Sequence, residues 1–133
     1  DSTGNLYNST KNSLTGESDG AASLGNLVVA LKDQGYVYYD PTEIEGDALD
    51  TLSVIKIEDV ILRGKPVIKD NLMVVSYGYG HTIFLVDISD LDNPSLIESI
   101  EVIGNPDVAE ITEDYILIPL RNEGLLMLKE KTD

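Results

Sequence analysis

Three aspartates stand close together in the segment FLVDISDLDNPSLIESIEVIG: Asp87 ends an apolar run, and Asp90 and Asp92 follow in a polar loop. Carboxylates in this arrangement are candidate ligands for Ca²⁺, a hard cation that takes about six to eight oxygens. The same residues suit a tight turn, because Asp side chains bond their own backbone and Pro94 fixes φ. We favour the turn, since Asp40-Pro41 occupies the same place in an earlier repeat, and keep calcium as the alternative. A second acidic loop with the same two explanations contains Glu43, Glu45, Asp47 and Asp50.

His81 is the only histidine, and the chain has no cysteine. Disulfides, thiolate metal sites and cysteine nucleophiles are therefore excluded, and one histidine is a poor basis for a zinc site. The preceding Gly78-Tyr79-Gly80 predicts a hairpin turn with positive φ, and no helix follows that would make it a dinucleotide motif. A turn histidine is a weak candidate for Ser-His-Asp catalysis. We predict a protein without catalytic activity.

Tyrosines and one sequon are the other candidate binding features. A sugar-binding platform of tyrosines is conceivable, but aromatic residues of strands are more often packing residues. Asn8-Ser9-Thr10 is the only glycosylation sequon, and Asn8 is a candidate glycan acceptor on a surface segment. The tyrosines lie at matching positions of two repeats: Tyr36, Tyr38 and Tyr39 in one, Tyr77 and Tyr79 in the next.

The chain is short and strongly acidic. Its 133 residues predict one domain, and its 24 acidic against 9 basic residues give a net charge of −15. This charge repels phosphate backbones, so nucleic acid and anionic membranes are poor partners. No apolar run approaches the roughly 20 residues of a membrane span. We expect a secreted or cell-surface protein, and the start at Asp1 fits either a processed chain or a fragment.

The sequence divides at about residue 24. Residues 1–23 are rich in Ser, Thr, Gly and Asn, which predicts a tail, a linker or a donated strand. Residues 24–133 contain short apolar runs separated by turn residues, which predicts an all-β domain. The expected strands are 27–32, 35–40, 53–58, 65–69, 72–77, 82–87, 96–103, 107–112, 115–120 and 124–130.

The β domain is repetitive. Its strand NLVVAL returns as NLMVVS and again as DYILIP, at a spacing of about 43–45 residues, and a second apolar strand follows each copy. Gly64-Lys65-Pro66 and Gly104-Asn105-Pro106 mark two repeat boundaries, which gives repeats of about 24–63, 64–103 and 104–133. Repeats of up to four short strands at this spacing match the blades of a β-propeller.

The segment LVDISDLDNPSLIESIEVIG also resembles the LVIVD-type repeats of bacterial and archaeal surface proteins, and the resemblance covers about residues 26–129. It implies propeller blades on a cell-surface scaffold and carries no specific activity. The first repeat departs from the pattern at YYDPTEIEGDALDT, and the third ends before the acidic corner.

The repeats amount to about two and a half blades, which leaves strand edges open. We consider three explanations: copies that complete one another, a piece of a longer surface protein, and repeats that have drifted to another β-architecture such as a sandwich. In the first, the tail adds a strand to the last blade of a neighbouring copy. The residues proposed for this assembly are Leu6, Tyr7 and Leu14 in the tail and Leu125, Leu126, Met127 and Leu128 in the last strand.

We therefore predict a non-catalytic extracellular or surface structural protein that forms homo-oligomers or filaments, with no cofactor unless Ca²⁺ binds. The alternatives are a propeller module that binds a glycan or a protein, and a fragment of a larger surface propeller.

Overall fold

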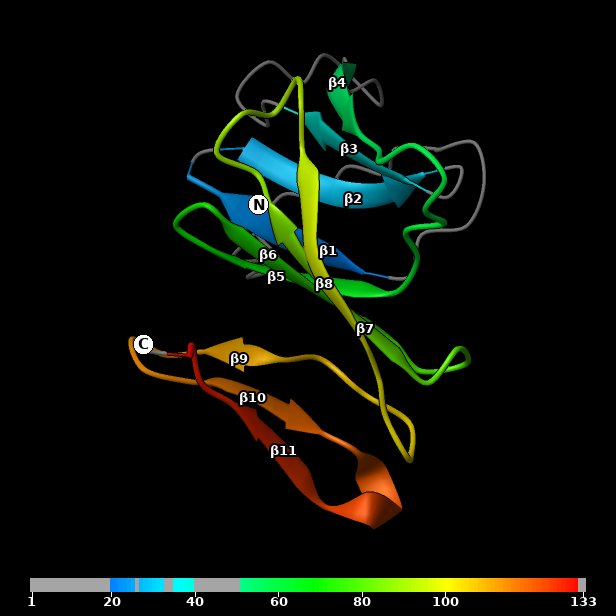
Figure 1. The fold of residues 1–133 in the computed structure, drawn as a ribbon. Helices are drawn as coiled ribbons and strands as arrows, with labels where there is room; N and C mark the ends of the chain where they lie inside the picture. The colour runs from blue at the N-terminus through cyan, green and yellow to red at the C-terminus, as the bar shows by residue number, and fades with distance from the viewer. Residues whose placement is uncertain (1–19, 26, 33–34, 40–50, 132–133) are drawn as a thin grey trace, which may run out of the picture.

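The computed structural model describes residues 20–25, 27–32, 35–39 and 51–131. The described chain is built from antiparallel sheets with one short 3₁₀ turn and no other helix. The predicted all-β class is confirmed, and the sheets follow one another as the blades of an incomplete β-propeller do (Figure 1). In the described part of the chain, no helix is long and apolar enough to cross a membrane.

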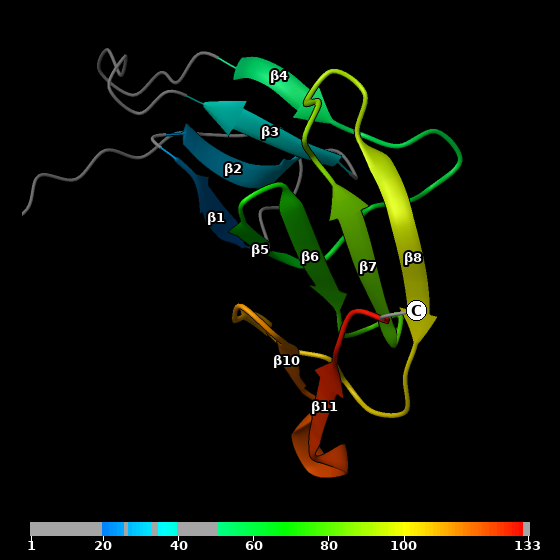
Figure 2. The same cartoon turned by 60° about the vertical axis from the view of Figure 1, so that its left-hand side comes forward.

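Three sheets follow one another in chain order (Figure 2). The first sheet contains β1 (Ala21–Leu24), β2 (Leu27–Lys32), β3 (Gly35–Tyr39) and β4 (Thr51–Ile55). The second contains β5 (Lys65–Lys69), β6 (Leu72–Tyr77), β7 (Thr82–Asp87) and β8 (Ser95–Glu101). The third contains β9 (Glu110–Ile111), β10 (Ile116–Pro119) and β11 (Leu125–Leu128), with the 3₁₀ turn η2 (Arg121–Glu123) between the last two.

The same hairpin opens the first and second sheets. Leu24 pairs with Leu27, and Lys69 pairs with Leu72, so each hairpin has a two-residue turn. Two-residue hairpin turns need positive φ because only then does their twist match that of the strands. Gly25 has a φ of 61° and Asp70, at the equivalent position, has a φ of 55°. The first and second repeats thus share the same hairpin turn, with a positive φ at its first residue.

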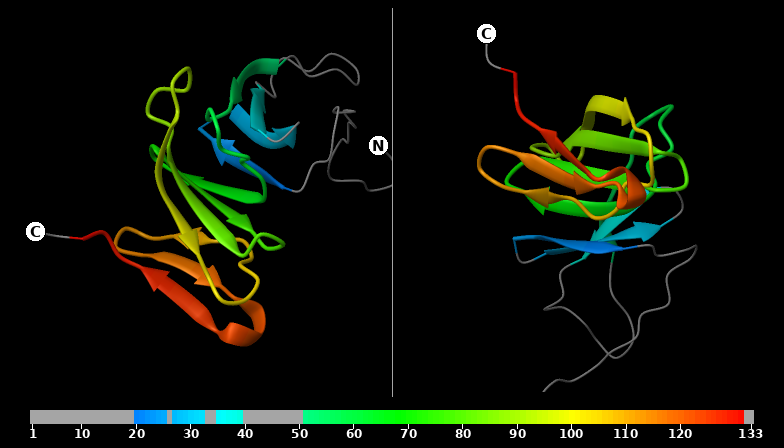
Figure 3. Two further views of the ribbon diagram at one scale, coloured as in Figure 1. Left: turned by 45° about the vertical axis from the view of Figure 1, so that its right-hand side comes forward. Right: turned by 90° about the horizontal axis from the view of Figure 1, so that it is seen from below.

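The first strands of the sheets lie next to one another: β1 contacts β5, and β5 contacts β9. Later strands of each sheet lie progressively farther from these three, so the sheets fan out around their first strands (Figure 3). This is the arrangement of propeller blades, whose first strands surround a common axis.

The core consists of two layers of apolar side chains, one on each side of the second sheet. Alternation along β6 sends Met73 and Val75 toward the first sheet, where they pack with Val29 and Ile55. Val74 points the other way and packs with Ile118 of the third sheet and its neighbours. Strands covered on both faces read as unbroken apolar runs, which explains why β6 has the sequence LMVVSY.

Glycine is required at the two predicted repeat boundaries. Gly64 has a φ of 125° and Gly104 a φ of 106°, values that side chains rarely adopt. A Cβ at Gly64 would lie 2.3 Å from the carbonyl oxygen of Ser76, and one at Gly104 would lie 2.9 Å from that of Leu120. The following Pro66 and Pro106 are buried. Only glycine at these boundaries lets the chain pass this close to the neighbouring backbone on its way from one blade to the next.

Several predicted strand limits differ from the structure. β1 was not predicted, and it begins inside the segment assigned to the tail, so the boundary at residue 23 falls within a strand. It forms the first strand of the first sheet, beside β2. β4 lies two to three residues earlier than predicted, and β9 is only two residues long. β5, β6 and β7 have the predicted limits.

Candidate functional site

The third sheet differs from the other two at its outer edge. Its strand order is β11-β10-β9, whereas the first and second sheets each have a fourth strand outside the third one. Within the described residues, nothing pairs with the outer side of β11. Exposed edge strands offer unpaired backbone groups to another chain, so β11 is the candidate interaction site.

The backbone groups at this edge can be identified from the ladder. Leu120 donates its N–H to the carbonyl of Gly124 at 2.7 Å, and the register pairs Ile118 with Leu126. Because hydrogen-bonded pairs alternate along an antiparallel ladder, Leu126 and Leu128 bond to β10. The N–H and C=O groups of Leu125 and Met127 therefore point outward and can bond to an added strand.

The side chains of β11 alternate between the two faces of the sheet. Leu126 and Leu128 are half-buried against the second sheet. Leu125 and Met127 are 58% and 53% exposed and lie on the opposite face. Of the predicted assembly residues, these four thus belong to one strand with an open edge and an exposed apolar face. Leu6, Tyr7, Leu14 and the sequon residue Asn8 lie outside the described residues.

The acidic corner between β7 and β8 has the geometry of consecutive turns. The carboxylate of Asp87 accepts the Ser89 N–H at 2.9 Å, and that of Asp90 accepts the Asp92 N–H at 3.1 Å and the Asn93 side-chain amide at 3.2 Å. These bonds favour the turn explanation. The Ser89 bond also lowers the pKa of Asp87.

Among the described residues, no three His, Cys, Asp or Glu side chains form a group able to hold a metal. Calcium at Asp87, Asp90 and Asp92 stays a prediction. Glu43, Glu45, Asp47 and Asp50 of the second acidic loop lie outside the described residues.

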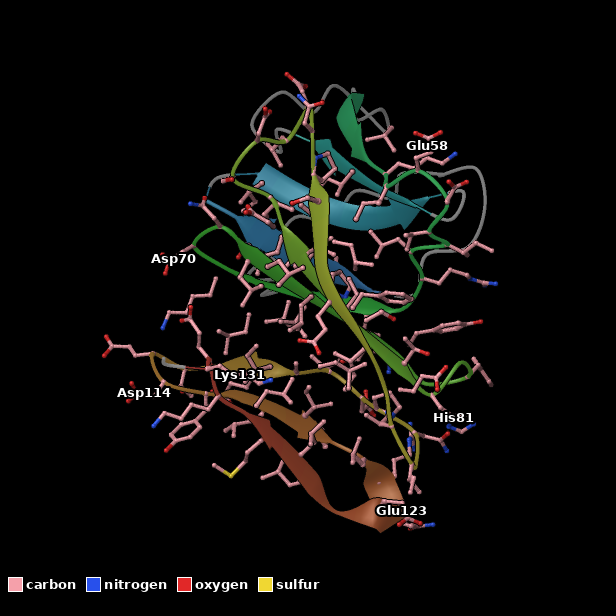
Figure 4. The ribbon with its side chains drawn as sticks, in the orientation of Figure 1. Glu58, Asp70, His81, Asp114, Glu123 and Lys131 are labelled. Atoms are coloured by element: carbon pink, nitrogen blue, oxygen red, sulfur yellow. The ribbon has the colours of Figure 1, made fainter. Side chains whose placement is uncertain are left out.

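His81 lies in the predicted turn between β6 and β7, and its backbone N–H donates a hydrogen bond to the Gly78 carbonyl at 3.2 Å. The predicted positive φ is wrong for Gly78 and Gly80; His81 itself adopts it, with a φ of 51°. Gly80 is needed for space, because a Cβ there would meet the Tyr77 ring at 2.5 Å. The His81 ring bonds through Nδ1 to the Gly104 carbonyl, and Figure 4 shows this histidine on the opposite side of the molecule from the Asp70 turn. These contacts give His81 a structural part in joining the turn to the β8–β9 loop.

One polar cluster was missed in the sequence. Asp107, between β8 and β9, accepts from Lys65 Nζ at 3.1 Å and from Arg121 Nη2 at 3.3 Å. It also accepts the Val108 N–H at 2.8 Å, and this bond, followed by the Lys65 contact, lowers the pKa of Asp107. The cluster links the second sheet to the third. Its residues are far apart in sequence, so no local pattern signals it.

The two tyrosines of the second repeat differ in exposure, and a sugar-binding platform stays a prediction. Tyr77 is half-buried with the Arg63 guanidinium 5.8 Å from its ring centre, whereas Tyr79 is 95% exposed at the turn tip. The side chains of Tyr36, Tyr38 and Tyr39 lie outside those described.

Comparison with solved structures gives matches to Hsv2, a seven-bladed β-propeller. Kluyveromyces lactis Hsv2 with its complete loop 6CD superposes with a TM-score of 0.60 and 8% identity, covering 86% of this chain and 33% of that one. The same protein with loop 6CD replaced by a Gly-Ser linker gives 0.58 and 9%, covering 84% and 35%. Neither a protein-family model nor a curated protein sequence matches the chain.

These matches concern the fold alone. The chain spans about a third of the length of the solved structures it matches. The chain thus has a β-propeller-like fold, and among the described residues no strand pairs with the outer edge of β11.

Proposed function

We propose that this protein is a non-catalytic structural module of the cell surface or extracellular space that assembles with copies of itself by strand complementation. The observation that carries the proposal is the outer edge of β11, where no described strand pairs and the backbone groups of Leu125 and Met127 face outward. A backbone N–H or C=O group that is buried without a hydrogen bond costs about 1–3 kcal/mol. A partner that covers the β11 edge must therefore hydrogen-bond to these groups, and an added strand can do so.

The donor in this proposal is the segment Leu6–Leu14 of another copy. It has Leu6, Tyr7 and Leu14 as apolar anchors among small polar residues, a composition suited to lie along an exposed edge. It also precedes β1, the strand at the inner side of the first sheet, so it is not needed to complete that sheet.

Particle size tests the proposal. Light scattering and electron microscopy of the purified chain should show assemblies much larger than one copy. Deleting residues 1–15 should abolish them and leave the β-rich circular dichroism unchanged. A 133-residue chain that stays monomeric at high concentration would refute self-assembly.

A proline at Met127 tests the acceptor edge. Met127→Pro removes an N–H that points outward and does not serve the β10–β11 ladder, so the hairpin should survive while assembly is lost. Met127→Ala is the matched control, because it shortens the side chain and keeps the N–H. Equal assembly of the proline and alanine variants would show that the edge is not used.

A binding module is the second candidate, and Tyr79 favours it. This residue is 95% exposed at the β6–β7 turn, which His81 joins to the β8–β9 loop with the exposed Ile103. Exposed aromatic and apolar residues on loops commonly mark binding surfaces. A glycan array probed with the wild type and with Tyr79→Ala tests this candidate: signals that require Tyr79, from a chain that remains monomeric, would favour binding over assembly.

A further inference from the structure

The third sheet has an apolar face whose residues are mostly exposed, and the sheet lies at one end of the stack (Figure 1). Its opposite face packs against the second sheet. We call the exposed side the outer face of the third sheet. The register places its apolar residues in two pairs, Leu117 with Met127 and Pro119 with Leu125. Pro119, Leu125 and Met127 are exposed, and Leu117 is half-buried.

The equivalent positions of the second sheet form a contact between blades. The sequence repeat aligns NLMVVS of β6 with DYILIP of β10, and the ladders extend this alignment to β7 and β11. The corresponding residues of the second and third sheets are Val74 and Leu117, Leu85 and Met127, Ile83 and Leu125, and Ser76 and Pro119. In the second sheet, the three apolar members pack with residues of the third sheet, and Ser76 is buried. The outer face of the third sheet thus has the residue types and positions of a surface that receives another sheet.

Two exposed charges flank this face on opposite sides. Glu110 of β9 pairs with Leu117, and β9 is one edge of the third sheet. Lys129 follows β11, the other edge, and its Nζ lies 5.7 Å from the centre of the Tyr115 ring. Since residues opposite each other across strands, and residues two apart along a strand, share a face, Glu110 and Lys129 lie on the side of Leu117 and Met127. The outer face therefore has a negative edge, an apolar centre and a positive edge.

We infer that the outer face of the third sheet packs on the same face of a second copy, around a two-fold axis that runs along the strands. This rotation sets β9 of each copy over β11 of the other, so Glu110 of one copy lies near Lys129 of the other, twice. Two-fold contacts require a surface that is complementary to itself, and the charges and the uncharged centre meet that requirement. The inference goes beyond the strand complementation proposed above and does not depend on it, because the face and the edge of β11 are different surfaces.

Charge selects this orientation over the other two-fold arrangement. An axis across the strands would set β9 over β9 and bring Glu110 against Glu110, and like charges oppose contact. Sheets packed face to face lie about 10 Å apart, a gap that the long side chains of glutamate and lysine can bridge. The centre of the face contains no ionisable side chain, so contact buries no unpaired charge there.

A chain without residues 1–15 isolates this contact, because it lacks the proposed donor segment and keeps every described residue. Analytical ultracentrifugation over a range of concentrations should show a dimer and nothing larger. Met127→Glu in this chain places a charge in the apolar centre and should weaken the dimer by about 100-fold or more. Ile97→Glu is the matched control, since Ile97 is 57% exposed on β8, outside the face, and should leave the dimer unchanged.

A charge exchange in the same truncated chain tests the two-fold pairing. Glu110→Lys gives a copy with two positive edges, and Lys129→Glu gives one with two negative edges; both residues are exposed, so the fold should persist. Each variant alone should dimerise about tenfold more weakly than the parent, because two exposed ion pairs become like-charge contacts. An equimolar mixture should restore the parent affinity, since a positive edge then meets a negative edge at both places.

Three results would overturn the inference: a truncated chain that is monomeric, which would leave the face to a foreign partner; a dimer that Met127→Glu does not weaken; and association beyond a dimer, which would mean that the face meets a different surface of the next copy. Single charge variants that dimerise as strongly as their mixture would also overturn it. The proposed function fails separately. A 133-residue chain that forms nothing larger than the truncated dimer would refute strand complementation and leave the face contact in place.

Discussion

At the scale of single residues, Asp107 connects parts of the chain that are distant in sequence. It joins Lys65 at the start of β5 to Arg121 of η2, and it caps the adjacent Val108 N–H. The carboxylate thereby holds the third sheet to the second at the exposed side of the stack. Both ion pairs are partly exposed, so their combined contribution is about 1 kcal/mol.

This cluster gives stability a specific pH dependence. The pKa of Asp107 is lower in the folded chain than its ordinary value, so its contribution is present above that value and is lost as pH falls through the folded pKa. Asp107→Asn should lower Tm by a few degrees at pH 7, and the gap between variant and wild type should begin to narrow below about pH 4 and close below the folded pKa. Thermal melts at several pH values measure this. Asp114→Asn, in an exposed turn, is the control, and a gap that does not narrow as pH falls below about 4 would contradict the charge-based explanation.

The acidic corner makes a second prediction at this scale. If Asp90 serves the turn, excess chelator should leave Tm unchanged, and Asp90→Ala should cost about 0.5–1.5 kcal/mol through two lost acceptor contacts. Calorimetry with and without chelator measures both. A chelator effect that disappears in Asp92→Asn would assign the corner to calcium instead.

At the scale of elements, the boundary glycines control how the chain passes from one blade to the next. Gly64→Ala would bring a Cβ within 2.3 Å of a backbone carbonyl at a φ of 125°, so we expect a loss of about 2–4 kcal/mol. Gly25→Ala is the matched control, because its φ is 61° and no atom lies within 4 Å of the added Cβ; its cost should be about 1 kcal/mol. Urea titrations give both values. Equal costs would show that the close approach at Gly64 is relieved by movement of the backbone.

The strands that could be predicted are those with long apolar or β-branched runs. β5, β6 and β7 were located correctly, because turn residues stand at both ends of their runs. β1 has the sequence AASL, whose small residues give no apolar signal; its place beside β2 and β5 makes it a strand. The corner at Asp90 was predictable from local turn chemistry. The Asp107 cluster was not, because blade packing alone brings Lys65 and Asp107 together.

At the scale of the whole molecule, two opposing forces would act on the proposed assembly. The β11 edge would favour contact between copies, whereas a net charge of −15 on each copy would oppose it. Raising ionic strength from about 0.01 M to 0.15 M shortens the screening length from about 30 Å to 8 Å. Assembly measured by light scattering should therefore increase with salt. A decrease would mean that ion pairs, rather than apolar surface and backbone bonds, hold the copies together.

The two-sided burial of the second sheet also sets the order in which the fold opens. Amide hydrogens exchange with solvent through local opening, and opening a sheet is hardest where neighbours cover both of its faces. Exchange of an unassembled chain should be slowest in β6 and β7 and faster in β10 and β11, so that protection declines from the middle of the stack toward the third sheet. The proposed addition of a strand at the β11 edge would slow exchange in β11 and so reduce this gradient.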